Sequence, residues 1–126
     1  MSTNALIVRE NADDTYDALY VHYDGYPEYL GKTLLENYNS LEHVNALMEL
    51  QGSIDFLETT IEETIKNVKQ LDISVRHYEA LDFIQEYMIS ETIIRYLYIF
   101  NVENSTFDIK YGRKTRKPLK DYLETI

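Results

Sequence analysis

The run TIIRYLYIFNV at residues 92–102 constrains the fold more than any other feature of the chain. It is almost continuously β-branched and aromatic, which is typical of a strand buried on both faces. We therefore expect a central strand of a sheet here. A turn at residues 103–105 and alternating side chains at residues 106–111 predict a hairpin partner for it.

The N-terminal residues predict a second hairpin. Residues 5–9, ALIVR, are short, apolar and β-branched, and residues 11–14 have the composition of a turn. Residues 16–23 then alternate with largely apolar or aromatic side chains on both faces. The dipeptide Asp24-Gly25 is expected to end this second strand.

Apolar residues spaced three and four apart predict helices between and after the hairpins. Pro27 suits the first turn of a helix, Ser40 can cap the next one, and Gly52 can close it. We expect helices over residues 27–38, 40–52, 53–70, 75–88 and 118–126.

These elements predict the α+β class, with two hairpins in one antiparallel sheet of about four strands and helices packed on one face. The length of 126 residues allows one hydrophobic core, so a single domain over residues 1–126 is expected. The sequence has neither an apolar run of about 18 residues nor a signal-peptide pattern, so we expect a cytoplasmic protein. The absence of cysteine excludes disulfides, thiol catalysis and thiolate metal sites.

Charge is unevenly distributed along the chain. Residues 1–109 contain 20 of the 22 acidic and six of the 12 basic residues, a net charge of −14, whereas residues 110–126 have a net charge of +4. Such an acidic body does not favour direct duplex DNA binding, and it suits a basic partner such as a nucleic-acid-handling enzyme. The partner-binding residues that we predict are Asp55, Glu58, Glu62, Glu63, Tyr23, Tyr26 and Tyr29. The alternatives are a solvated helix face for the carboxylates and core packing for the tyrosines.

The segment HYDGYPE suggests a different kind of site. His22 and Asp24 could perform acid–base chemistry beside a helix N-terminus, and together with Tyr26 they could bind a small ligand or nucleotide. The alternative is a simple turn with a hydrogen-bonded sheet histidine. The three histidines are scattered without metal-ligand spacing, and no nucleophile motif is present, so no metal, no cofactor and no catalytic residue are predicted.

One stretch of sequence resembles a known family. Residues 18–28, ALYVHYDGYPE, are followed by Gly31-Lys32 and by LLENY at residues 34–38. This pattern is similar to that of a family of small, mostly uncharacterised proteins encoded by bacteriophages, prophages and plasmids. That family commonly reads Tyr-x-His-Trp-Asp-Gly-Tyr, then Gly-Lys-x-Leu and later Gly-x-Ile-Ser, for which residues 52–55 here read GSID.

The resemblance covers residues 4–55 well and residues 78–111 loosely. Tyr23 replaces the usual tryptophan, and residues 56–77 have no counterpart in the family pattern. The resemblance implies a mobile-element origin and names no reaction.

Two functional hypotheses follow. The first is a non-enzymatic phage or mobile-element protein that inhibits a host factor, such as an anti-CRISPR or other anti-defence inhibitor, through its acidic, tyrosine-rich surface. The second is a small-ligand or nucleotide-binding protein, or a weak hydrolase, that uses His22, Asp24 and Tyr26. Self-association through the aromatic strand edge is a third, weaker alternative.

Overall fold

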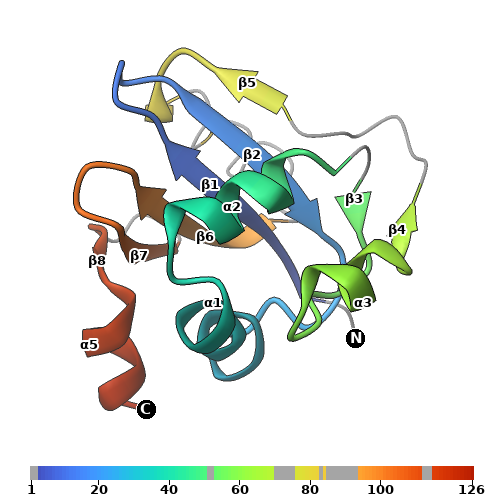
Figure 1. Cartoon of the computed structure of the whole chain (residues 1–126). Coiled ribbons are helices and arrows are strands. Elements are labelled where there is room, and N and C mark those ends of the chain that lie inside the picture. The colour runs from blue at the N-terminus through green and yellow to red at the C-terminus, as the bar shows by residue number, and fades with distance from the viewer. Residues whose placement is uncertain (1–2, 51–52, 70–75, 83, 85–93, 112–114) are drawn as a thin grey trace.

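The computed structural model describes residues 3–50, 53–69, 76–82, 84, 94–111 and 115–126. Within these residues the chain forms one mixed sheet of eight strands with short helices around it (Figure 1). The strands are β1 (Asn4–Glu10), β2 (Tyr16–Val21), β3 (Ser53–Ile54), β4 (Val68–Lys69), β5 (Arg76–Tyr78), β6 (Ile94–Asn101), β7 (Thr106–Tyr111) and β8 (Lys117–Pro118). The helices are the π-helix η1 (Pro27–Gly31) and the α-helices α1 (Lys32–Asn37), α2 (Leu41–Met48), α3 (Ile61–Ile65) and α5 (Leu119–Glu124).

The sheet has the strand order β4-β3-β2-β1-β6-β7-β8, and β5 pairs with the outer edge of β2. Both predicted hairpins are present, since β1 pairs antiparallel with β2 and β6 pairs antiparallel with β7. As expected, β6 lies in the interior of the sheet between two other strands. Local sequence signals were sufficient for these elements because both strands of each hairpin are close along the chain.

The predicted antiparallel sheet of about four strands is wrong. The two hairpins join through β1 and β6, which run parallel over seven residue pairs from Asn4↔Ile94 to Glu10↔Asn101. β2 and β3 also run parallel. The remaining short strands have only two or three residues each, too few to produce a periodic pattern. Which edges of two hairpins meet, and in which direction, is a tertiary choice that their separate sequences do not encode.

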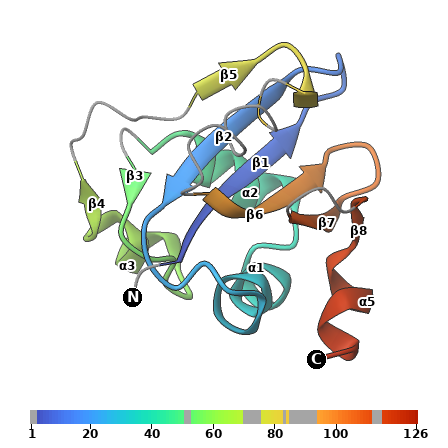
Figure 2. The same ribbon diagram turned by 180° about the vertical axis from the view of Figure 1, so that it is seen from behind.

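Both faces of the central strands are buried. On one face Ala5, Ile7 and Tyr98 pack with residues of α1 and α2, which cover this side of the sheet in Figure 1. On the other face, seen in Figure 2, Leu6 and Val8 belong to a second cluster that includes Ile84. The absence of polar alternation along β1 and β6 therefore reflects two separate apolar clusters, one on each side of the sheet.

The predicted helix over residues 27–38 is present in two parts. Pro27 begins a π-helical turn, η1, and α1 continues from Lys32. The predicted Ser40 cap is confirmed, because its side-chain oxygen accepts a hydrogen bond from the backbone N–H of His43 at the start of α2. Tyr38 ends α1 with its side chain buried, and its hydroxyl reaches Glu58 in the loop between β3 and α3.

The predicted helix over residues 53–70 is wrong. Ile54 lies in a strand, Thr60 caps a new helix by accepting from the N–H of Glu63, and β4 follows α3. Ile65, one of the apolar residues on which the spacing rested, has 54% of its surface exposed. The apolar residues repeat at helical intervals by coincidence, and the capping threonine interrupts the helix that they suggested.

The start of the predicted helix over residues 75–88 is wrong, because Arg76–Tyr78 form the strand β5. Residues 79 and 80 are not helical, whereas Leu81, Asp82 and Ile84 are, and the other residues of the predicted helix, 75, 83 and 85–88, lie outside the described residues. The last helix is confirmed as α5, and the buried Leu119 docks it on the sheet beside β7 and η1. Within the described residues no helix is long and apolar enough to cross a bilayer.

Candidate functional site

The DGY turn, residues 24–26, follows β2. The two residues before this turn are hydrogen-bonded through their backbones to residues 54 and 55 of the β3 segment. The N–H of His22 donates to the carbonyl of Ile54 at 3.0 Å, and the N–H of Tyr23 donates to that of Asp55 at 2.6 Å. Asp24 then adopts a left-handed conformation with φ of 57°, which aspartate tolerates better than most residues. The carboxylate of Asp24 is thereby presented at the surface.

Gly25 occupies a position where a side chain does not fit. A Cβ atom there would lie 2.6 Å from the carbonyl oxygen of Thr3 and 2.9 Å from the Cβ of Ala5. The Gly25 N–H donates to the Thr3 carbonyl at 2.9 Å, and its own carbonyl accepts from the buried hydroxyl of Tyr98 at 2.6 Å. Burial raises the pKa of Tyr98, so this hydroxyl remains a donor. The turn is therefore anchored to β1 and β6 immediately after Asp24.

A second loop, between β3 and α3, borders the same pocket as the turn. Hydrogen bonds from side chains of neighbouring segments hold this loop in place. The hydroxyl of the buried Tyr38 donates to the carbonyl of Glu58 at 2.7 Å, and the Glu58 N–H donates to the hydroxyl of Thr64 at 3.0 Å. Burial is the main cause that raises the pKa of Tyr38, and the charges of Glu62 and Glu58 raise it further. These contacts position the backbone of Glu58, and its side chain remains available at the surface.

A pocket of about 290 Å³ lies between the turn and this loop. Its lining consists of Asp24, Tyr29, Leu30, Thr33, Phe56, Leu57 and Glu58. Tyr29 and Phe56 are strongly exposed for aromatic residues, at 60% and 39%. Neither carboxylate of the lining has an ion-pair or hydrogen-bond partner within the described residues. The pocket is therefore negatively charged and bordered by aromatic rings.

The predicted partner-binding carboxylates differ in how free they are. Asp55 forms an ion pair with Lys69 at 3.3 Å, and Glu63 forms one with Lys66 at 3.1 Å. Glu62 lies in the first turn of α3 and has no such partner in the described part of the chain. Of the predicted partner-binding carboxylates, Glu58 and Glu62 therefore have no ion pair within the described residues, and the same holds for Asp24, which the sequence had assigned to a different site.

The predicted tyrosines also divide. Tyr23 is 42% exposed and Tyr29 is more exposed still, whereas Tyr26 is half-buried with its ring packed against Tyr29 and Tyr96. Tyr26 therefore belongs to a band of rings that reaches across η1 and β6.

The residues of the predicted ligand site are directed to different places. The Nδ1 of His22 lies 3.1 Å from the hydroxyl of Tyr20, Tyr26 packs on Tyr96, and Asp24 alone lines the pocket. No hydrogen bond joins His22 to Asp24 within the described residues. The ligand-binding role of His22, Asp24 and Tyr26 stays a prediction.

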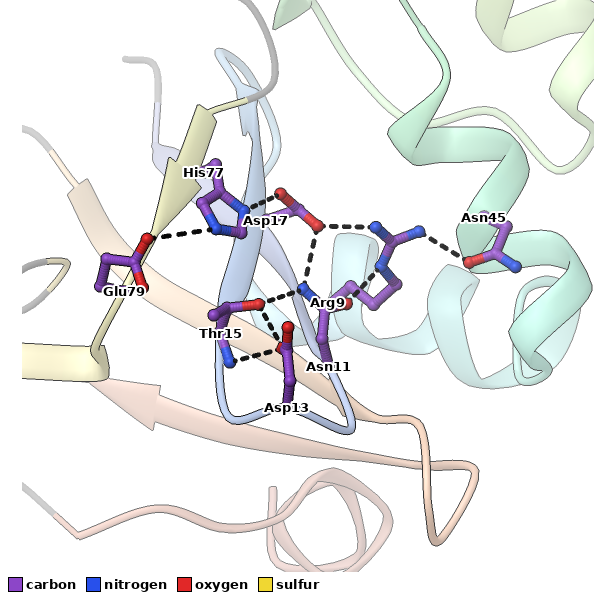
Figure 3. A network of polar contacts seen from close by, with 8 residues as sticks. All are labelled: Arg9, Asn11, Asp13, Thr15, Asp17, Asn45, His77 and Glu79. Carbon is purple, nitrogen blue, oxygen red and sulfur yellow. Dashed lines mark hydrogen bonds and ion pairs between the residues drawn. The ribbon is translucent and has the colours of Figure 1, made fainter.

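A separate polar network joins the β1–β2 hairpin to β5 and α2 (Figure 3). Asp17 lies at its centre, 2.6 Å from Nη2 of Arg9, 3.0 Å from the side-chain amide of Asn11 and 2.9 Å from Nδ1 of His77. Arg9 also donates to the side chain of Asn45 on α2 at 2.8 Å. The cross-strand register places Arg9, Asp17 and His77 in one row, which only the paired strands reveal.

Hydrogen bonds in this network shift the pKa values of both His77 and Asp17. The hydrogen bond that the His77 ring makes to the Asp17 carboxylate raises the pKa of His77, with smaller contributions from the charges of Asp17 and Glu79. Burial of Asp17 opposes its ionisation, but hydrogen bonds from His77, Asn11 and Arg9 outweigh burial and lower its pKa. Within the described residues no hydroxyl is hydrogen-bonded to His77.

A second ion-pair cluster joins the far ends of β1, β7 and β8. Arg116 donates to both carboxylate oxygens of Glu10 at 3.0 Å and to Asp108 at 2.9 Å. The hydrogen bonds from Arg116 are the largest influence that lowers the pKa of Glu10. This cluster binds the C-terminal segment to the sheet.

Four residues of the pocket were not predicted from the sequence, namely Leu30, Thr33, Phe56 and Leu57, and Phe56 is the most exposed apolar residue among them. It stands in the segment SIDFLE, where an aromatic residue flanked by acidic ones is the available signal. The interpretation of residues 53–70 as one amphipathic helix concealed it. Among the described residues no group of three or more potential ligands could hold a metal ion. No family model, curated protein or solved structure matches the chain.

Proposed function

We propose that the protein is a non-enzymatic binding protein that engages a basic partner through the face formed by the DGY turn and the β3–α3 loop. The observation that carries this proposal is the joint presence of unpaired carboxylates, Asp24 and Glu58, and exposed aromatic rings, Tyr29 and Phe56, around one pocket. Aromatic residues with exposed rings are enriched in protein interfaces, and complementary charge accelerates association and selects partners.

The partner that this proposal names is a nucleic-acid-handling host nuclease, with CRISPR effectors as the first candidates. Its support is the resemblance of residues 18–38 to mobile-element proteins and the net charge of −14 over residues 1–109. The surface that such a nuclease uses to hold nucleic acid is basic, so an acidic protein can occupy it and compete with the nucleic acid. Cytosolic action is part of the same proposal.

The test is inhibition of purified CRISPR effector nucleases loaded with guide RNA. The wild-type chain should inhibit target cleavage by at least one effector, and inhibition should weaken as salt rises because the interface is ionic. The variant Asp24→Asn/Glu58→Gln should lose inhibition. A control with the same change in charge, Glu103→Gln/Glu124→Gln, neutralises exposed carboxylates of the β6–β7 turn and α5 and should retain it.

The proposal fails if the wild-type protein inhibits none of the effectors and protects no phage from a defence-carrying host. Equal loss of inhibition in both charge variants would also count against it. In that case net charge, and not the pocket face, would govern binding.

A further inference from the structure

We propose that the pocket between the DGY turn and the β3–α3 loop is a socket for one arginine side chain of the partner. The identity of the occupant as a partner side chain rests on the proposed function above. The preference of the pocket for a guanidinium group rests on its own geometry and can be measured separately.

The size of the pocket limits what can enter. A volume of about 290 Å³ lies just below the range of about 300–1,000 Å³ that is typical of sites for drug-sized ligands. A single long side chain suits this space better than a nucleotide or a bulky metabolite. Its opening between two loops on the surface also allows a side chain to enter from a docked protein.

The charge of the pocket selects a cation. Asp24 and Glu58 contribute two carboxylates, and neither lysine nor arginine is among the lining residues. Both carboxylates lack a partner in the described parts of the chain, whereas their neighbours Asp55 and Glu63 are paired. Negative charge that the fold does not neutralise itself attracts a cation and repels a phosphate or carboxylate ligand.

The aromatic rings favour a guanidinium over an ammonium group. Tyr29 and Phe56 border the carboxylates with much of their ring surface exposed. A guanidinium is planar, weakly hydrated, stacks on aromatic faces and donates paired hydrogen bonds to carboxylates, whereas an ammonium is compact and strongly hydrated. Thr33 also lines the pocket, and its side chain carries a hydroxyl that can accept a hydrogen bond.

Contacts within the protein hold the backbone of Asp24 and of Glu58 in place before any ligand arrives. Asp24 is fixed between the Tyr23 N–H bond to Asp55 and the packed Gly25. Glu58 is fixed through its carbonyl by the buried Tyr38. A site on such anchored backbone loses little conformational entropy when the ligand binds.

The test is an NMR titration of the ¹⁵N-labelled full chain with blocked arginine, N-acetyl-arginine amide. Saturable shifts should be confined to amides of the turn and the β3–α3 loop, such as those of Asp24, Phe56 and Glu58. The corresponding citrulline compound, which has the same shape and no charge, should bind about tenfold more weakly or not at all. Blocked lysine should also bind more weakly than blocked arginine.

Matched variants locate the binding. Asparagine tolerates the left-handed conformation as aspartate does, and glutamine has the shape of glutamate, so the variants Asp24→Asn and Glu58→Gln should both fold. Unchanged signals in the rest of the NMR spectrum would verify this. Each should weaken arginine binding about tenfold, whereas Glu103→Gln/Glu124→Gln should leave it unchanged.

The inference is overturned if blocked arginine causes no saturable shifts at the pocket, or if citrulline or lysine binds equally well. If blocked arginine does not bind but the protein inhibits an effector, the arginine socket is wrong and the proposed function is retained. Saturable arginine binding without inhibition of any effector would support the socket and contradict the proposed function.

Discussion

Replacement of Gly25 by alanine tests whether the DGY turn is as tightly packed as the structure indicates. The new Cβ would lie 2.6 Å from the carbonyl oxygen of Thr3, the residue that precedes the central strand β1, and 2.9 Å from the Cβ of Ala5 in that strand. Because backbone atoms of a central strand cannot move aside cheaply, overpacking should cost about 1–3 kcal/mol. The adjacent hydrogen bonds to Thr3 and from Tyr98 would also weaken, at about 1 kcal/mol each.

A smaller effect acts in the opposite direction. Alanine restricts the unfolded chain more than glycine does, which stabilises the fold by about 0.4–1 kcal/mol. The net expectation for Gly25→Ala is therefore a loss of about 2–4 kcal/mol in the free energy of unfolding. This loss is a large fraction of the stability of an ordinary domain of this size.

Gly31→Ala is the matched control. Its Cβ would approach the side-chain atoms Cδ1 of Leu119 at 3.1 Å and Cε1 of Tyr98 at 3.2 Å, which can shift by a few tenths of an ångström. Gly31 is also helical, with φ of −60°, so alanine gains helix propensity there. We expect a change within about 1 kcal/mol of the wild type.

Urea denaturation followed by circular dichroism compares the two variants. The reasoning predicts a clearly lower midpoint for Gly25→Ala at an unchanged slope, with the midpoint for Gly31→Ala close to that of the wild type. If Gly25→Ala were as stable as Gly31→Ala, the close approach of the turn to β1 would be incorrect. The arginine affinity of a folded Gly25→Ala protein should also fall, since the substitution moves the adjacent Asp24.

Three other perturbations test the supports of the site and the fold. Tyr38→Phe removes the hydrogen bond to the Glu58 carbonyl and should cost about 1–2 kcal/mol in urea denaturation; an unchanged midpoint would contradict this role. The pKa of His77 is raised above its ordinary 6.5 by Asp17, so its stabilising effect is fully present below that value and is lost as pH rises through the raised pKa. The melting temperature should therefore fall between about pH 6 and 8 more steeply in the wild type than in His77→Gln, and parallel profiles would refute the assignment. Arg116→Gln leaves two half-buried carboxylates without their cation and should cost about 1–3 kcal/mol, whereas Lys120→Gln, an exposed control, should cost much less.

Elements defined by neighbouring residues were predictable from the sequence. The β1–β2 and β6–β7 hairpins, the Ser40 cap and α5 all follow from strand-forming residues, turn residues, a capping side chain and local apolar spacing. Each of these signals acts over a few positions along the chain, so the sequence carries it without the rest of the molecule.

The arrangement of those elements was not predictable in the same way. The parallel pairing of β1 with β6 depends on contacts between residues about 90 positions apart, and β3, β4 and β5 are strands only because a neighbour supplies their hydrogen-bond partners. Residues 53–70 show the converse error, since a helical spacing of apolar residues does not decide structure when a capping threonine and strand neighbours compete with it.

The same division applies to the candidate site. The sequence by itself suggested Glu58 and Tyr29 as partner-binding residues and Asp24 as a ligand-binding residue. Their residue types and their positions along the chain were sufficient for these predictions. Only the tertiary structure placed them around one pocket with Phe56, and only it showed which carboxylates lack a cation. The physical reason is that charge pairing and pocket shape depend on distances between segments far apart in the chain, and the packing of β2 against β3 determines those distances.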